Sequence, residues 1–352
     1  MPVQAKDFAL VVGINDYPSY GIGGNNLRGA ADDARAVAGW LTDRQDGGGL
    51  PARHCELIVS AADPLRPLKH EVDAALERLW NAAAEVPDPR RFYLYFSGHG
   101  HAERIDDVAL CLANWSFRRR HAALSSGAYR RLIHHCMRFD QVVVILDCCR
   151  LRQHAAAGLR SELDCVLPDE QAGSSRFFIA YATEFQQAAF EDTDGGADGP
   201  VRGHMTLALL EGLRGAAPLQ PGGGVAAHDL ADYLRARVPE MAGPDQPRQQ
   251  VEVVSSLPSN PPVLFGSRGL KAPDARQPAA GTTNCRILFS SGREGPIRLE
   301  SPTLEVLRED SVSSGPWELH LEIGHHRIAD LATGAEHFFV QRSLQGINDV
   351  SF

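Results

Sequence analysis

The feature that most constrains the fold of this chain is an alternation between short apolar runs and segments with helical periodicity. The apolar runs lie at residues 8–14, 55–61, 91–96, 141–146 and 176–182. Runs of this length are typical of strands buried on both faces of a sheet. Apolar residues recur at helical spacing within residues 27–41, 68–86, 126–138, 205–213 and 228–238. The alternation predicts an α/β fold, in which a mostly parallel sheet is flanked by helices on both faces.

The pattern changes in the last part of the chain. Residues 268–283 are rich in Pro, Ala, Gly and Arg, a composition typical of a linker. Residues 284–352 contain short alternating runs separated by Gly and Ser turns, which predicts a small all-β domain just large enough for its own core. We therefore expect one α/β domain over residues 1–267. The β-rich domain that follows is expected to be regulatory or to recognise a partner or effector.

Charge and composition exclude several classes of function. The chain has 35 basic and 44 acidic residues, and its net charge of −9 argues against nucleic acid or an anionic membrane as the main partner. No apolar run approaches the roughly 18 residues of a membrane span, and no signal pattern precedes the first run, so a cytoplasmic location is expected. The seven cysteines are odd in number and irregularly spaced, which predicts reduced thiols. The pattern C-x-x-C does not occur, so neither a zinc site nor another cofactor is expected.

Two strand ends carry the residues that are expected to perform chemistry. Residues 91–96 run into the motif SGHG around His99, and residues 141–146 run into DCCR around Cys149. Functional residues of parallel sheets gather beyond the carboxyl ends of the strands, so we expect His99 and Cys149 to lie close together. A free thiol is mostly protonated at neutral pH, but a neighbouring histidine can take its proton and later protonate a leaving amine. The pattern predicts Cys149 as nucleophile and His99 as general base and acid.

The residues around these two have expected roles of their own. Glycines flank His99 and leave backbone amides accessible, so the N–H groups of Gly100 and Cys149 are expected to hold an oxyanion. Adjacent strand residues point to opposite faces, so Cys148 is expected in the core if Cys149 faces the cleft. We expect His101 to be a solvated loop histidine, not a second base or a metal ligand.

Taken together, these motifs resemble the caspase and metacaspase group of cysteine peptidases, family C14 of clan CD, in its bacterial type. His99 and Cys149 are 50 residues apart, about the separation found in caspases. Residues 27–34 (LRGAADDA) are similar to the first helix of metacaspases, and residues 204–212 to the small-subunit helix. The resemblance covers about residues 6–267. It implies a caspase-like fold and a regulated or self-processing endopeptidase, and its bacterial members suggest a role in stress or antiviral defence.

The resemblance also implies a specificity pocket. In metacaspases the positions that match Asp33, Ser97 and Asp147 line the pocket for the side chain before the scissile bond. Two carboxylates there favour a basic side chain, and arginine over lysine because its planar fork bonds two acceptors at once. The expected substrate is a protein with Arg or Lys before the cleaved bond. Arg28 lies near Asp33 in the sequence, and its charge would oppose this specificity.

Self-processing and calcium dependence are two further properties of such peptidases. Residues 150–175 are polar and arginine-bearing and lie where caspases are cut into two subunits, so self-cleavage is expected there. No spaced aspartates match a metacaspase calcium site, because Asp106 and Asp107 are too near His99. The acidic stretch 191–198 is expected to be a surface loop instead of a calcium site.

Two alternatives remain open. The chain could be a catalytically silent caspase fold that acts as a binding scaffold, although the intact pair of His99 and Cys149 argues against this. It could also be a related hydrolase that matures a single partner protein, which the sequence does not separate from a general regulatory protease.

Overall fold

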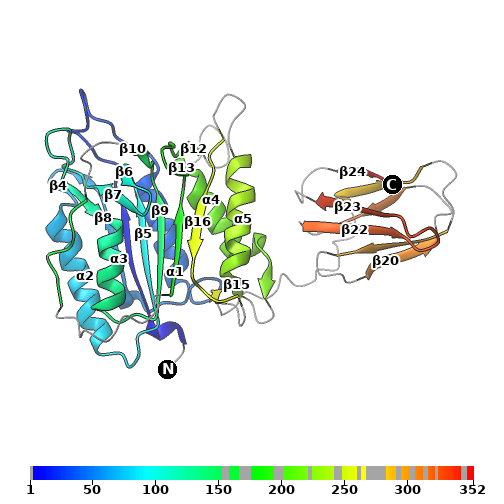
Figure 1. Ribbon diagram of the computed structural model, residues 1–352, viewed down its shortest axis with the longest axis horizontal. Coiled ribbons are helices and arrows are strands. Elements are labelled where there is room, and N and C mark those ends of the chain that lie inside the picture. The colour runs from blue at the N-terminus through cyan, green and yellow to red at the C-terminus, as the bar shows by residue number, and fades with distance from the viewer. Residues whose placement is uncertain are drawn as a thin grey trace. The chain divides into compact units, whose positions relative to one another are not determined.

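The computed structural model describes residues 3–152, 158–165, 176–193, 201–220, 224–241, 248–259, 263–266, 283–290, 295–301, 306–311, 316–321, 324–341 and 347–352. The chain divides into two compact units, Met1–Ala272 and Pro273–Phe352, which are described separately (Figure 1). Within the described ranges, no helix is both long and apolar enough to cross a membrane.

The first unit is built on a six-stranded sheet with the strand order β16-β11-β9-β5-β1-β2. Its strands are β1 (Asp7–Gly13), β2 (Cys55–Val59), β5 (Arg91–Ser97), β9 (Gln141–Asp147), β11 (Arg176–Tyr181) and β16 (Glu252–Ser255). All neighbours pair in parallel except β16, which runs antiparallel to β11. Every residue of the three central strands β1, β5 and β9 is buried. The prediction of a mostly parallel sheet is confirmed.

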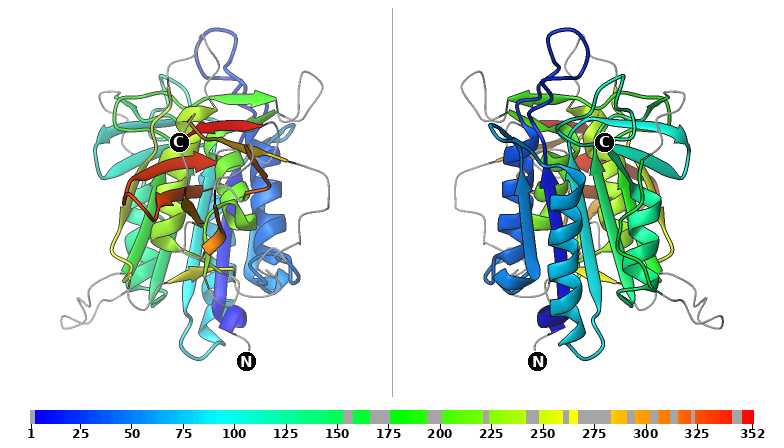
Figure 2. Two further views of the ribbon diagram at one scale, coloured as in Figure 1. Left: turned by 90° about the vertical axis from the view of Figure 1, so that its right-hand side faces the viewer. Right: turned by 90° about the vertical axis from the view of Figure 1, so that its left-hand side faces the viewer.

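Helices cover both faces of this sheet, as the apolar spacing predicts. They are α1 (Ala30–Thr42), α2 (Lys69–Ala84), α3 (Ser126–His135), α4 (His204–Glu211) and α5 (Ala227–Glu240). Alternate residues of β1 enter separate cores: Phe8 packs with α2 residues such as Val72, whereas Ala9 packs with α1 residues such as Val37. The helices α2 and α3 therefore lie on one face, and α1, α4 and α5 lie on the other. Figure 2 shows the helices running alongside the strands from two sides.

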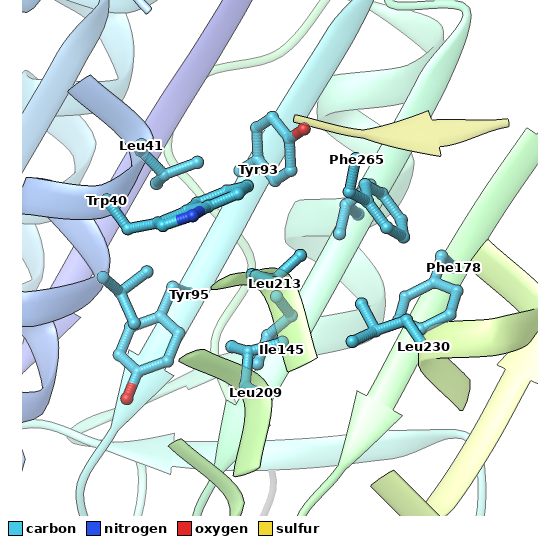
Figure 3. A pocket seen from close by; sticks show the side chains of 12 residues that line it. Trp40, Leu41, Tyr93, Tyr95, Ile145, Phe178, Leu209, Leu213, Leu230 and Phe265 are labelled. Atoms are coloured by element: carbon cyan, nitrogen blue, oxygen red, sulfur yellow. The ribbon is translucent and has the colours of Figure 1, made fainter. Parts of the chain in front are cut away.

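A small cavity lies inside the core between the sheet and the helices α1, α4 and α5 (Figure 3). Its lining is aliphatic and aromatic, and no charged side chain faces it. The side chains that surround it come from both layers: Trp40 and Leu41 from α1, Tyr93 and Tyr95 from β5, Ile145 from β9, Phe178 from β11, Leu209 from α4, Leu230 from α5, and Leu213 and Phe265. We regard it as a gap in core packing, because an apolar enclosure of this kind offers no group for catalysis.

A second, four-stranded sheet lies at the carboxyl edge of the first, in the order β10-β6-β7-β8. Its strands are β6 (Gly100–Arg104), β7 (Asp107–Cys111), β8 (Ala123–Ser125) and β10 (Leu151–Arg152). The strand β6 begins directly after His99, and β10 begins two residues after Cys149 and pairs in parallel with β6. The two segments that leave the catalytic motifs therefore remain neighbours.

The remaining elements of the first unit are short. They are η1 (Val3–Lys6), η2 (Ala52–His54), η3 (Gly212–Ala216), β3 (Ala61–Ala62), β4 (Leu65–Arg66), β12 (Glu191–Thr193), β13 (Val201–Gly203), β14 (Leu219–Gln220), β15 (Gly224–Ala226) and β17 (Leu264–Phe265). Among them, the hairpin of β12 and β13 approaches the catalytic motifs, because Gly203 lies against Asp147.

The second unit consists of β strands, as the alternating runs predict. They are β18 (Cys285–Leu288), β19 (Pro296–Glu300), β20 (Val306–Ser311), β21 (Trp317–Leu319), β22 (Gly324–Asp330), β23 (Glu336–Gln341) and β24 (Asn348–Ser351). They form a sheet in the order β21-β18-β24 and another in the order β20-β19-β22-β23. A core of its own contains Ile287, Leu299, Trp317 and Ile328.

The structure contradicts one expectation about the cysteines. Cys136, at the end of α3, and Cys165 form a disulfide, so the prediction of seven reduced thiols is wrong for these two. The pairing depends on the docking of residues 158–165 against β8. There, Leu159 exchanges backbone hydrogen bonds with Ala123 and Ser125. Cysteine spacing carries no information about such docking.

The separateness of the two units leads to a prediction about truncation. A chain that ends at Gly266 should remain soluble and unfold cooperatively, because it keeps Phe265, which is 1 % exposed and packs 5.3 Å from Phe178 between ring centroids. In that shortened chain, Phe265→Ala should lower the free energy of unfolding by about 3–5 kcal/mol. The half-exposed Phe117 is the matched control, and Phe117→Ala should change it by less than about 1 kcal/mol. Urea denaturation followed by circular dichroism measures both, and an insoluble shortened chain would refute the division.

Candidate active site

The pairing of β5 with β9 places the two catalytic motifs side by side. Ser97, the last residue of β5, is the register partner of Asp147, the last residue of β9. His99 and Cys149 each follow two residues later. Gly100 packs closely on the second motif, because a Cβ atom there would lie 2.7 Å from the carbonyl oxygen of Cys149. The structure therefore brings both motifs to one edge of the sheet, as expected.

The backbone and ring of His99 are held by groups from the loop after β1. The His99 N–H donates to the Tyr17 hydroxyl at 3.0 Å, and this hydroxyl donates to the Cys111 carbonyl at 3.1 Å. His99 Nε2 lies 2.7 Å from the Asn25 carbonyl oxygen. A carbonyl only accepts, so Nε2 carries the proton, and Nδ1 is the basic nitrogen of the neutral ring. Burial lowers the pKa of His99, opposed by the Asn25 carbonyl and the Glu191 carboxylate, so the resting ring is neutral at pH 7.

His101 supports the His99 ring indirectly, through Tyr20. It is buried, so the expectation of a solvated loop histidine is wrong. Its Nε2 lies 2.9 Å from the Tyr20 hydroxyl, and its ring packs 4.9 Å from that of Trp115. Tyr20 in turn packs 4.5 Å from the His99 ring. Burial, with a smaller contribution from His99, lowers the pKa of His101 to about 4, which keeps it uncharged and suited to aromatic packing.

The thiol of Cys149 is half-buried and faces the backbone of Ala189. The Ala189 N–H donates to Cys149 Sγ at 3.3 Å. Burial raises the pKa of this thiol, and the Ala189 N–H lowers it. Among the described residues, no hydrogen bond joins the sulfur to the His99 ring. The neighbouring Cys148 is buried and would contact a Cβ at Gly100, which confirms the expectation that it faces the core.

Arg150 anchors the turn that carries Cys149. Its side chain is fully buried, and its guanidinium donates to the Glu252 carboxylate, to the Thr183 carbonyl at 3.1 Å and to the Ile105 carbonyl at 2.6 Å. The guanidinium also lies 3.9 Å from the ring centroid of Tyr181. The sequence identified Arg150 only as a neighbour of the nucleophile. Its partners come from three distant segments, which no local pattern reveals.

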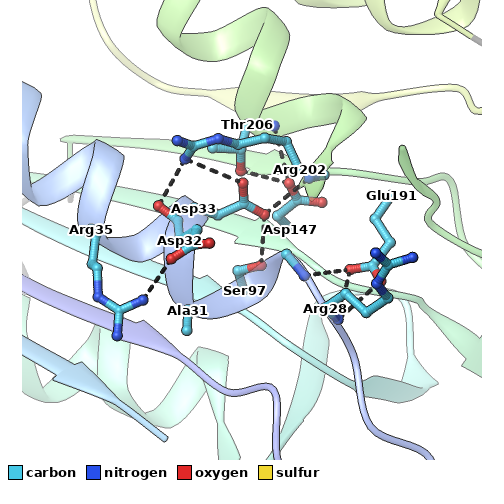
Figure 4. A network of polar contacts seen from close by, with 12 residues as sticks. Arg28, Ala31, Asp32, Asp33, Arg35, Ser97, Asp147, Glu191, Arg202 and Thr206 are labelled. Atoms are coloured by element: carbon cyan, nitrogen blue, oxygen red, sulfur yellow. Dashed lines mark hydrogen bonds and ion pairs between the residues drawn. The ribbon is translucent and has the colours of Figure 1, made fainter. Parts of the chain in front are cut away.

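The expected pocket residues Asp33, Ser97 and Asp147 also come together (Figure 4). Ser97 Oγ lies 3.4 Å from Asp33 Oδ2, which also accepts the Gly203 N–H at 3.0 Å. Asp147 Oδ2 accepts the Thr206 N–H at 3.0 Å and the Thr206 hydroxyl at 2.6 Å. Asp147 thereby caps the first turn of α4. Both carboxylates are buried, with Asp33 1 % and Asp147 5 % exposed.

Burial sets the charge state of this pocket. It raises the pKa of Asp33 to about 8, with a further contribution from the Asp147 charge, while Gly203 and Arg202 act in the opposite direction. Burial also raises the pKa of Asp147 to about 6, against the two bonds from Thr206. Two neighbouring carboxyl groups in a water-poor site resist carrying two negative charges. A cation that entered would release this constraint, so the pocket is chemically suited to a positive side chain.

Two residues of this site were missed in the sequence. Glu191, assigned to a surface loop, accepts the backbone N–H groups of Arg28 and Gly29, both at 3.0 Å, and its charge acts on both His99 and Asp147. The cation near Asp33 is Arg202, not the expected Arg28, whose contact with the network is its backbone N–H. Both lie beside a Gly- and Asp-rich stretch, which indicated only a loop. Residues 194–198 of that stretch lie outside the described residues.

No metal-binding arrangement was found in the part of the chain that the structure describes: no three His, Cys, Asp or Glu side chains are grouped to hold an ion.

Comparison with known proteins agrees with the geometry. The family model of the caspase domain matches residues 6–260, which include both catalytic motifs and the acidic pocket. Among solved structures, the crystal structure of caspase-1 from Spodoptera frugiperda is similar over 72% of this chain and 90% of that chain, with 14% sequence identity and a TM-score of 0.41. No curated protein matches the sequence. On the family match, the chain belongs to the caspase-domain family of cysteine peptidases.

Proposed function

We propose that the protein is an endopeptidase in which Cys149 attacks the scissile carbonyl and His99 transfers the proton. The observation that carries this proposal is the contact between His99 Nε2 and the Asn25 carbonyl. It fixes the ring tautomer so that Nδ1 can act as base, at the sheet edge where Cys149 emerges. An orienting acceptor on the far nitrogen of the base is a recurring part of nucleophilic catalysis.

The resting pair is neutral, because burial lowers the pKa of His99 and raises that of Cys149. In the proposed reaction, His99 takes the thiol proton as Cys149 Sγ attacks the carbonyl carbon. The backbone N–H groups of Gly100 and Cys149 stabilise the oxyanion. The imidazolium then protonates the departing amine, and water hydrolyses the resulting thioester with the same histidine as base.

Substitution of the two cysteines tests the choice of nucleophile. Cys149→Ala and His99→Ala should each lower kcat/KM for peptide cleavage by a factor on the order of 10⁴ or more. Cys148→Ala should retain substantial activity, because Cys148 faces the core. Steady-state cleavage of a fluorogenic peptide measures this, with thermal unfolding of each variant as the folding control. Loss of turnover in Cys148→Ala together with retained turnover in Cys149→Ala would show that the nucleophile is misassigned.

We further propose that the enzyme cuts after arginine, and less readily after lysine. Asp33, Ser97 and Asp147 line the pocket in this proposal, and Glu191 extends the negative charge towards His99. Such a pocket attracts a guanidinium and repels an acidic side chain. Its carboxyl groups must ionise before they can attract, so the preference depends on pH.

The pH dependence can be isolated with two peptides that differ only in arginine or its uncharged analogue citrulline before the cleaved bond. Both share the ionisations of Cys149 and His99, which cancel in the ratio of their kcat/KM values. This ratio should rise as pH increases from 5 to 8.5, because Asp147 and Asp33, with pKa values of about 6 and about 8, lose their protons in that range. The rise should be about tenfold for each unit by which the bound guanidinium lowers a pocket pKa.

Asp147→Asn is the matched variant for this experiment, because the amide oxygen still accepts from Thr206 while the charge is removed. It should flatten the lower part of the pH profile and reduce arginine cleavage far more than citrulline cleavage. A ratio that is independent of pH in the parent enzyme, or faster cleavage after aspartate, would refute the pocket assignment.

Self-cleavage within residues 150–175 is a further part of the proposal. Within this loop the structure describes residues 150–152 and 158–165, and the latter are docked: the Ser161 hydroxyl donates to Asp73 at 2.7 Å, and Cys165 is bonded to Cys136. Residues 153–157 and 166–175 lie outside the described residues. Cleavage after Arg152 or Arg160 would leave Cys165 on the second fragment, and the disulfide would then join the two fragments.

Gel electrophoresis with and without reducing agent tests this idea. Active enzyme should show two fragments under reducing conditions, and Cys149→Ala none. If the cut follows Arg152 or Arg160, the fragments should migrate as one species without reductant, and Cys165→Ser should separate them. Mass spectrometry identifies the cut. An active enzyme that stays whole would refute self-processing but not the peptidase activity.

The biological setting of this activity is also a proposal. The resemblance to bacterial members supports a regulated protease in stress or antiviral defence. The second unit has a core of its own, and we propose that it recognises a regulatory partner or effector.

A further inference from the structure

The hairpin of β12 and β13 lies directly on the acidic pocket. Glu191 of β12 pairs with Gly203 of β13, and the Gly203 N–H donates to Asp33 Oδ2 at 3.0 Å. A Cβ atom on Gly203 would lie 2.2 Å from Asp147 Oδ2, so the strand leaves no space above that carboxylate. In this conformation both aspartates are covered, with Asp33 1 % and Asp147 5 % exposed.

The same strand brings its own cation into the pocket. Arg202 Nη1 donates to the Asp32 carbonyl at 2.7 Å and lies 3.9 Å from Asp33 Oδ1. That oxygen is buried and has no hydrogen-bond partner in the ranges that the structure describes. The Arg202 side chain is itself only 19% exposed. The guanidinium lowers the cost of ionising the buried Asp33 carboxyl group, so it stabilises the closed arrangement.

The other strand of the hairpin, β12, is also bound to the segment that precedes α1. The Glu191 carboxylate accepts the backbone N–H groups of Arg28 and Gly29, which lead into α1. Gly29 packs closely on β13, because a Cβ atom there would lie 2.9 Å from the Val201 carbonyl oxygen. The contacts to α1 therefore run along both strands of the hairpin, and Arg202 is the point at which a positive charge enters the pocket (Figure 4).

We propose that Arg202 is an internal occupant of the acidic pocket, which stays closed until the guanidinium of a substrate arginine displaces it. The inference rests on the proposed preference for arginine and adds its regulation. Exchange of one guanidinium for another preserves the charge of the pocket, so a basic side chain can open it where a neutral one cannot. The structure thus represents a closed form of the enzyme. The guanidinium that closes the pocket and the guanidinium that opens it are the same chemical group.

The test measures the binding of N-ethylguanidine, which mimics the end of an arginine side chain. The protein carries Cys149→Ala, so that it is expected to be catalytically inactive. Arg202→Gln in this background should bind N-ethylguanidine about tenfold more tightly, because the ligand no longer competes with an internal cation. Arg35→Gln is the matched control: it removes an equal charge from α1, where Arg35 is 54% exposed and pairs with Asp32. It should leave the affinity unchanged. Isothermal titration calorimetry gives the affinities, and N-ethylurea, which is neutral, should not bind any variant.

Equal or weaker binding by Arg202→Gln would overturn the proposal and show that Arg202 builds the pocket. If Arg202→Gln does not fold, Arg202→Lys decides, since its shorter side chain keeps the charge but loses the bond to the Asp32 carbonyl. It should bind N-ethylguanidine more tightly than the parent, and unchanged binding would overturn the proposal. Cleavage of arginine peptides is measured separately. If the binding changes appear as expected but arginine peptides are not cleaved, the proposed function is refuted and the role of Arg202 is not. If arginine peptides are cleaved but the binding changes do not appear, the role of Arg202 is refuted and the proposed function is not.

Discussion

The parallel pairing of β5 with β9 is the constraint on which the rest of the site depends. Because Ser97 and Asp147 are register partners, the residues that follow them leave the sheet at the same height. A shift by one residue would turn His99 or Cys149 away from the edge, since side chains alternate between faces. The sheet tolerates no such shift, because all seven residues of each strand are buried and the apolar residues between the polar strand ends alternate between two cores.

The sequence allowed the sheet, the helices and the catalytic motifs to be predicted, because their information is local. Apolar runs such as residues 141–146 bury both faces, and SGHG and DCCR mark where two of them end. The orienting groups could not be predicted in this way. Asn25 acts through its carbonyl, which every residue has, and Glu191 lies in a stretch whose composition indicates only a loop. The disulfide partner of Cys136 likewise depends on how a distant segment docks.

The acidic pocket shows how burial and charge act against each other. The structure places Asp33 and Asp147 where water is scarce, so their ionisation is unfavourable, and it offsets this with donors from Ser97, Gly203 and Thr206 and with the charge of Arg202. A site that served stability alone would contain fewer buried carboxyl groups, because each one is costly to ionise there. The arrangement is therefore costly for stability, whereas His101 is buried in its uncharged form and packs against aromatic rings.

Arg150 has a consequence for the synthesis of this protein. The guanidinium of Arg150, the residue after Cys149, is buried and its charge is paired with Glu252 of β16, the last strand of the sheet, which lies 102 residues further along the chain. While that strand is still inside the ribosome, Arg150 is a buried charge without its carboxylate, and the turn that carries Cys149 lacks its anchor. The ion pair that anchors this turn therefore becomes available only when almost the whole first unit has been translated.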